Sequence, residues 1–192
     1  MATSAEIGAF LRARGKRVLT FAGYSASGYQ DPAAMLGAAA QVLAGHSPGC
    51  TWINIGATEA GIGAVYPLAR QLGFATLGIV SSLAREQALA LSPSVDRVFF
   101  VADSHWGGCL PGSTQLSPTS AALVEHSDEL VAIGGNRVAA DELMAACAAG
   151  KAVRFMAADM DHRLAVQRAA RRGEPAPTDF RGAADAAWAA RR

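Results

Sequence analysis

The sequence predicts an α/β fold, in which helices cover both faces of a mainly parallel, doubly wound sheet of the Rossmann-like kind. Short apolar runs alternate with helix-like stretches over residues 17–156, as in consecutive β-α-β units. The apolar runs show no regular alternation of apolar and polar residues, which is typical of parallel strands buried on both faces. Right-handed crossovers between such strands give an open, doubly wound sheet.

The first predicted elements are a strand, a helix and a second strand. Residues 17–23 (RVLTFAG) are β-branched and aromatic and end in glycine, which favours a buried strand. Asp31 can cap a helix over 31–43, and Pro32 suits the first turn of that helix. Residues 51–56 (TWINIG) repeat the strand pattern.

The remaining elements continue this alternation. A helix is predicted over 61–72, since Gly73 can close it, and Ser117 can cap another over 117–127. Shorter apolar runs and alanine-rich stretches supply the other elements. The further predicted strands are 74–80, 96–102, 128–135 and 151–156, and the further predicted helices are 83–91 and 138–150.

Composition limits the class of protein. The 192 residues suit one domain, and a hydrophobic fraction of 51% with 17% charged residues can fill a core. A net charge of +1 gives no electrostatic footprint for nucleic acid, and no apolar run approaches the roughly 18 residues of a membrane span. Neither nucleic acid nor a membrane is therefore expected as a partner.

The ends of the chain and the cysteines complete this outline. The N-terminus does not have the pattern of a signal peptide. Cys50, Cys109 and Cys147 are odd in number and far apart, which favours a reducing cytoplasm, and Cys50 and Cys147 are predicted to be buried small residues. Residues 1–158 form the predicted Rossmann-like nucleotide-binding domain, and residues 159–192 a linker followed by an alanine-rich helix.

Three small-residue loops follow predicted strands at the edge where a doubly wound sheet binds its ligand: 22–31 (AGYSASGYQD), 56–63 (GATEAGIG) and 134–137 (GGNR). Glycines let a phosphate reach backbone N–H groups, and the helix starts that follow add positive dipole ends. One such loop alone fits tight strand–helix packing equally well, but three together favour a shared anion site. The candidate ligand-binding residues are Gly23, Ser25, Ser27, Gly56, Ala57, Thr58, Glu59, Gly61, Ile62, Gly63, Gly134, Gly135, Asn136 and Arg137.

The order of these motifs resembles a known family. GATEAGIG stands where LOG-type enzymes carry GGGxxGLMG, and IGGNRVAAD stands where they carry PGGxGTxxE. Over residues 17–156 the chain is similar to LOG-type, lysine-decarboxylase-like or cytokinin phosphoribohydrolase-like Rossmann proteins of the SLOG superfamily. The resemblance implies a nucleotide or phosphoribosyl ligand across the loops. Some members cleave the N-glycosidic bond of nucleoside 5′-monophosphates, others only bind such ligands, and a molybdenum cofactor carrier is a related case.

The second motif departs from the family at several positions. Ile133 replaces its proline, and Arg137 and Val138 replace its Gly-Thr pair. Asp141 stands at the glutamate position with Glu142 beside it, so these two acids are the catalytic candidates. They lie about 100° apart around a helix, so both cannot enter one crevice. Equally, acids in a first helical turn can simply complement the helix dipole.

Two further residues carry open alternatives. Arg137 could clamp a phosphate, because a guanidinium pairs well with phosphate oxygens. Glu59 could bind a ribose hydroxyl or be an exposed loop acid. Because the second motif departs from the family pattern, we rank binding above hydrolysis. The three hypotheses, in order, are a nucleotide-binding protein, a phosphoribohydrolase, and a carrier of a nucleotide-like cofactor such as the molybdenum cofactor.

The irregular stretch 103–116 (DSHWGGCLPGSTQL) is expected to form a flexible loop over the crevice, where Trp106 or His105 stacks on a ligand base. The alternative is that the aromatic side chain only pins the loop to the domain. Asp103, His105 and Cys109 match no zinc spacing, so no metal and no resident cofactor are predicted. Apolar helices over 33–44 and 139–149, together with the resemblance, predict a homodimer.

Overall fold

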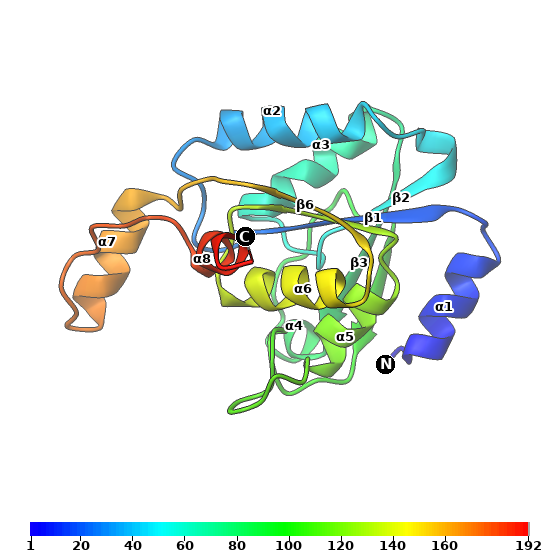
Figure 1. Ribbon diagram of the computed structural model, residues 1–192. Coiled ribbons are helices and arrows are strands. Elements are labelled where there is room, and N and C mark those ends of the chain that lie inside the picture. Colours follow the sequence, from blue (N-terminus) through cyan, green and yellow to red (C-terminus); the bar gives the residue numbers. More distant parts are fainter. Residues whose placement is uncertain (192) are drawn as a thin grey trace.

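The computed structural model, in which residues 1–191 are described, contains a six-stranded sheet with strand order β4-β3-β2-β1-β5-β6 (Figure 1). Every pairing between neighbouring strands is parallel, with Leu19 of β1 opposite Ile53 of β2 and Phe21 of β1 opposite Val131 of β5. The strands are β1 Arg17–Gly23, β2 Thr51–Asn54, β3 Ala75–Ser81, β4 Arg97–Val101, β5 Glu129–Ile133 and β6 Ala152–Met156.

Helices cover both faces of this sheet, with α2 and α3 on one side and α1, α5 and α6 on the other (Figure 1). Side chains of β1 alternate between these layers: Leu19 and Phe21 pack with α2 and α3, whereas Val18 packs with α1 and Ala22 with α6. The α/β, Rossmann-like fold class is therefore confirmed. The helices are α1 Ser4–Arg12, α2 Pro32–Leu43, α3 Val65–Gln71, α4 Leu83–Glu86, α5 Pro118–Glu125, α6 Arg137–Ala148, α7 His162–Arg171 and α8 Ala183–Ala189, with 3₁₀ turns η1 Pro48–Cys50 and η2 Gly61–Ala64.

The strand order places the crevice. The chain moves outward from β1 to β4 and then returns to the other side of β1 with β5. At this change of direction the connections diverge, which opens a space beyond the carboxyl ends of β1 and β5. The loops that follow β1, β2 and β5 all end at this edge.

Three local predictions need correction. The N-terminal helix α1 was not predicted, although Thr3 and Glu6 form a complete capping box at its start. The predicted helix 61–72 begins as the 3₁₀ turn η2, and the predicted helix 83–91 stops at Glu86, because Ala88 takes a positive φ of 50°.

The C-terminal segment contains α7 as well as the predicted last helix. Asp161 caps α7 by accepting a hydrogen bond from the N–H of Leu164 at 2.8 Å. Helix α8 docks on the domain beside α6, where the N–H of Ala184 donates to the carbonyl of Gly135 and Trp188 packs on Phe155. The boundary between residues 158 and 159 stays a prediction.

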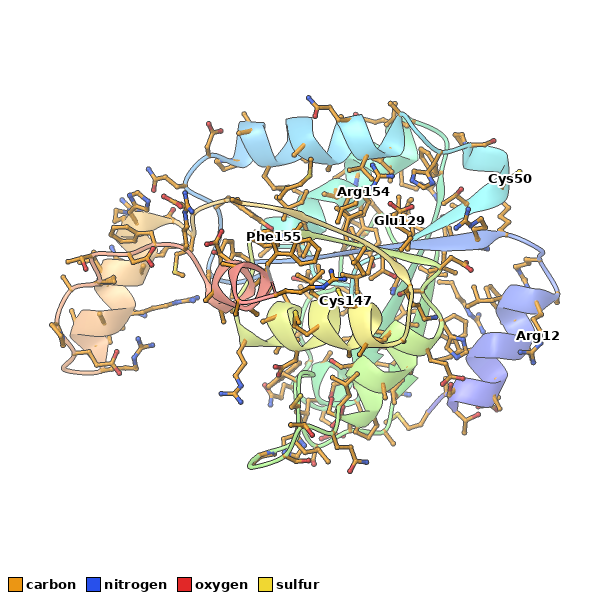
Figure 2. The ribbon with its side chains drawn as sticks, in the orientation of Figure 1. Arg12, Cys50, Glu129, Cys147, Arg154 and Phe155 are labelled. Atoms are coloured by element: carbon orange, nitrogen blue, oxygen red, sulfur yellow. The ribbon has the colours of Figure 1, made fainter. Side chains whose placement is uncertain are left out.

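The cysteines are less buried than predicted. All three are free, Cys50 is exposed and Cys147 is half-buried. Figure 2 shows Cys50 and Cys147 far apart, with Cys50 in the turn before β2 and Cys147 on α6. A surface turn and the outer side of a helix expose these positions, which composition alone does not reveal. Within residues 1–191, no helix is long and apolar enough to cross a membrane.

Candidate functional site

A cleft of about 460 Å³ lies beyond the carboxyl ends of the strands, at the point where the strand order reverses. Its walls come from the end of β1, the loop after β2, the end of β3, residues 89–91, Trp106 and the start of α6. A volume of this size suits one small-molecule ligand. The predicted site residues that line it are Gly23, Ser25, Gly56, Thr58, Ile62, Asn136 and Glu142.

The other predicted site residues lie around this cleft without lining it. Ala57 is buried behind its wall, Glu59 and Arg137 are exposed, and Ser27 faces a neighbouring cavity. The remaining residues of this group are Gly61, Gly63, Gly134, Gly135 and Asp141.

Most of the loop glycines are needed for packing between loops. Gly61 has a positive φ of 61°, and a Cβ there would collide with the carbonyl oxygens of Tyr24 and Ser25. A Cβ on Gly63 would collide with the carbonyl oxygen of Thr58. Gly56 differs, because it lines the cleft and the nearest atom to a Cβ there would be the Ile79 carbonyl oxygen at 3.8 Å. Close packing therefore explains Gly61 and Gly63, whereas Gly56 has open space around it and a positive φ of 50°, which itself favours glycine.

Tyr66 holds the edge of the cleft together. Its buried hydroxyl accepts hydrogen bonds from the N–H groups of Ile55 and Ala57 at 2.8 and 3.2 Å and donates to the carbonyl of Leu77 at 2.7 Å. The burial raises the pKa of Tyr66 above its ordinary value, so the hydroxyl remains a donor. One side chain thereby fixes the loop after β2 onto β3.

Tyr29 fixes the loop after β1 onto the end of β5, and Tyr24 fixes the same loop onto the segment before α8. The Tyr29 hydroxyl donates to the carbonyl of Ile133 at 2.7 Å, and the Tyr24 hydroxyl accepts from the N–H of Gly182 at 2.7 Å. Sequence reasoning missed all three tyrosines. For Tyr24 the available signal was its position directly after a predicted strand, because a buried tyrosine hydroxyl normally finds a polar partner.

The N-terminus of α6 opens onto the cleft without a side-chain cap. Asn136 is its N-cap residue, but the Asn136 amide donates to the Ser27 hydroxyl at 2.9 Å. The first bond of the helix runs from the N–H of Ala140 to the carbonyl of Asn136, so the N–H groups of residues 137–139 have no intrahelical acceptor. Val138 and Ala139 line the cleft. Unpaired N–H groups at a helix N-terminus can attract an anion.

The two acidic candidates on α6 have different environments. Glu142 lines the cleft, is 6% exposed, and accepts a 2.6 Å hydrogen bond from the Ser120 hydroxyl. Burial raises the pKa of Glu142 to about 7, although the Ser120 hydrogen bond opposes this shift. Asp141 instead accepts from the N–H of Cys109 at 2.8 Å and lies 4.0 Å from Arg137. Glu142 therefore belongs to the cleft, and Asp141 anchors the 103–116 loop.

The 103–116 loop is tied down more firmly than predicted. Besides the Asp141 contact, the N–H of Gly108 donates to the Ser120 hydroxyl at 2.7 Å, and Cys109 pairs with Leu116. Trp106 lines the cleft and remains 47% exposed. The loop is thus an anchored hairpin that presents one aromatic side chain.

Asp103 has a structural role at the base of this loop. It accepts hydrogen bonds from the N–H groups of His105 and Thr119, at 2.8 and 2.9 Å, so it caps the start of α5. Burial acts to raise the pKa of Asp103, but these hydrogen bonds outweigh it and the pKa lies below its ordinary value. In the part of the chain that the structure describes, no three His, Cys, Asp or Glu side chains gather as a metal site.

The natural protein should lose folding stability as the pH rises from about 4.5 to about 7, and we expect Glu142→Gln to abolish this loss. Because the folded protein holds this proton up to about pH 7 and an unfolded glutamate releases it near 4.5, folding stability falls as pH rises through this range. The difference corresponds to about 3 kcal/mol. Urea unfolding at pH 5 and pH 8 should show the variant gaining stability over the natural protein at pH 8 by that amount.

Asp141→Asn is the matched control, because it removes the neighbouring carboxyl and leaves Glu142 in place. It should retain the fall in stability between pH 5 and pH 8. Equal pH dependence in the natural protein and Glu142→Gln would show that Glu142 is not the group responsible.

These features define an α/β protein with a Rossmann-like fold and a small-molecule cleft at the switch point of its sheet. No protein-family model and no curated protein matches the chain. Solved structures do match it: a structural genomics target named TM1055 shares 20% identity over 71% of this chain and 72% of its own, with a TM-score of 0.53.

Two structures of the molybdenum cofactor carrier protein from Chlamydomonas reinhardtii are also similar. The first shares 19% identity over 73% of this chain and 76% of its own, and the second 17% over 82% and 85%, each with a TM-score of 0.53. These likenesses show the α/β, Rossmann-like fold, and membership of the SLOG superfamily stays a prediction. The LOG subtype belongs to the proposals below.

Proposed function

We propose that the protein binds a phosphorylated nucleotide or a related phosphoribosyl compound in the cleft, with the phosphate at the start of α6. The observation that carries this proposal is the uncapped N-terminus of α6 on the wall of a cleft of about 460 Å³. Free N–H groups and the helix dipole both attract a phosphate.

The rest of the cleft suits a sugar and a base. Ser25 and Thr58 offer hydroxyls and Gly56 offers open backbone, as a ribose would require. On another wall, Trp106 and Leu89 are large apolar side chains that remain about half exposed. An aromatic base stacked there would cover apolar surface that otherwise meets water. Arg137, at the rim, can reach a bound phosphate by leaving its exposed contact with Asp141, since such pairs contribute little.

Hydrolysis of the ligand is the second candidate, and Glu142 is the observation in its favour. A carboxyl with a pKa of about 7 inside a cleft suits proton transfer near neutral pH. Cleavage of an N-glycosidic bond also needs stabilisation of an oxocarbenium-like charge, for which an ionised carboxylate is suited, and Asp141 holds the loop instead. We therefore rank binding first. Release of free base from nucleoside monophosphates, lost in Glu142→Gln but kept in Asp141→Asn, would reverse this ranking.

Carriage of a cofactor is a special case of the binding proposal. It is supported by the structural likeness to the molybdenum cofactor carrier protein over most of both chains. The same anion position and apolar wall would serve a nucleotide-like cofactor.

Thermal unfolding with a panel of ligands tests the proposal. The panel contains nucleoside mono- and diphosphates, ADP-ribose and inorganic phosphate. A ligand at 100 times its Kd should stabilise the fold by about 2.7 kcal/mol. A flat response across the panel would contradict the proposal.

We further propose that the protein is a cytoplasmic homodimer. The outer side of α2 carries small residues, the exposed Ala33 and Gly37 and the partly exposed Ala40, which a second copy could cover. The free cysteines fit a reducing compartment. Light scattering on a sizing column should give twice the monomer mass of 19.7 kDa, and a monomer mass at micromolar concentration would refute the dimer.

A further inference from the structure

A second cavity of about 410 Å³ adjoins the cleft. It lies between the loop after β1 and the C-terminal segment that contains α7, so a part of the chain outside the β-α-β units builds one of its walls. Asn136, the N-cap residue of α6, lines both cavities. The loop after β1 also reaches both, with Ser25 and Ala26 in the cleft and Ser27 in the second cavity.

A hydrogen-bond network centred on Ser27 connects the two cavities. The buried Ser27 hydroxyl oxygen accepts from the Asn136 amide at 2.9 Å and from the Arg168 guanidinium at 2.7 Å. A serine hydroxyl has one proton besides its two lone pairs, so Ser27 can still donate to a ligand. Arg168 also donates to the carbonyl of Ala26 at 2.7 Å, which fixes its guanidinium beside the loop.

The second cavity is lined by two arginines, Arg168 and Arg172, and by two carboxylates, Glu174 and Asp179, and Arg168 is the cation that is positioned for an anion. Within residues 1–191, Arg168 has no carboxylate at ion-pair distance, whereas Arg172 on the same wall pairs with Glu174 at 2.7 Å. A guanidinium held by neutral groups keeps its full charge available, and its planar donors match phosphate oxygens. The start of α6 and Arg168 thus offer two anion-binding positions on either side of Asn136.

We propose that the two cavities form one site for an extended ligand, a nucleoside diphosphate esterified to a sugar or to a second nucleoside. One nucleoside lies in the cleft, the diphosphate passes Asn136, and the second group occupies the cavity beside α7. This inference rests on the proposed function and specifies its ligand class. Taken together, the two cavities approach the upper end of the size range of small-molecule sites.

The test compares short and extended ligands of the same base: adenosine monophosphate with ADP-ribose, and guanosine monophosphate with GDP-mannose. For the preferred base, the extended ligand should bind at least about tenfold more tightly in calorimetric titration. Ala165→Phe, which fills the second cavity from α7, should abolish this preference and leave the affinity for the monophosphate within about twofold.

Val166→Phe is the matched control, because Val166 is the next residue of α7, is exposed and does not line the cavity. It should keep the preference. Arg168→Gln provides a second variant on the cavity wall, because it removes the guanidinium without a carboxylate partner, and should weaken the extended ligand by about threefold or more.

The outcomes separate the two proposals. Equal affinity for short and extended ligands, or a preference that survives both Ala165→Phe and Arg168→Gln, overturns the extended site and leaves nucleotide binding in place. Failure of every ligand to bind overturns the proposed function, and the extended site with it.

Discussion

Gly61→Ala should destabilise the protein by about 3 kcal/mol or more, because two penalties act at one position. The residue has a positive φ of 61°, which alanine adopts only with strain, and the new methyl group would collide with the carbonyl oxygens of Tyr24 and Ser25. For a chain of this length the melting temperature should fall by roughly 6 to 12 °C. Calorimetry or circular dichroism measures the change.

Gly37→Ala is the matched control. Gly37 lies in the middle of α2, has an ordinary helical φ, and a Cβ there would meet no atom within 4 Å. Alanine at this position should stabilise the helix by about 0.5 to 1 kcal/mol. If Gly61→Ala proved as harmless as Gly37→Ala, the close contact between the loops after β1 and β2 would be wrong.

Ala60→Trp should weaken nucleotide binding by at least about a hundredfold, or nearly 3 kcal/mol. Ala60 is exposed and lines the cleft, so a tryptophan there would fill space that the ligand needs without disturbing the core. The measurement is calorimetric titration with the ligand that stabilises the natural protein most. The melting temperature without ligand should change little.

Ala13→Trp controls for the new aromatic surface. Ala13 is also exposed, but it follows α1 and lies ahead of β1, at the opposite end of the sheet from the cleft. Its affinity should match that of the natural protein. Undiminished binding by Ala60→Trp would mean that the ligand sits elsewhere.

The fold could be predicted from the sequence because the strands give strong signals. Runs such as 17–23 and 128–135 are continuous and apolar, and the observed strands β1 and β5 fall inside them. Helix ends were less predictable, because they depend on single backbone angles. Helix α4 ends just before Ala88, which has a positive φ that is unusual for alanine and cannot be predicted from the residue type. The capping box of α1 can be recognised in the sequence from Thr3 and Glu6. The residues that follow it do not form a strong apolar pattern, so no helix was predicted there.

The candidate site was predicted only in part. The loops were identified by their small residues, but composition could not separate glycines that line the cleft, such as Gly56, from those that let loops pack, such as Gly61 and Gly63. The direction of side chains on α6 could not be predicted either. Glu142 lines the cleft and the adjacent Asp141 does not, because consecutive residues of a helix point in directions about 100° apart. Contacts far apart in sequence, such as Arg168 with Ser27, leave no local signal.

Amide chemical shifts, followed while the protein is titrated with the nucleotide that stabilises it most, show directly where the ligand binds. We expect the largest changes on the amides of Gly56, Val138 and Ala139, which border the cleft at the carboxyl ends of the strands. Amides at the opposite edge of the sheet, such as those of Gly8 and Asp128, should not move. Changes concentrated at that opposite edge, or no changes at saturating nucleotide, would contradict binding in the cleft.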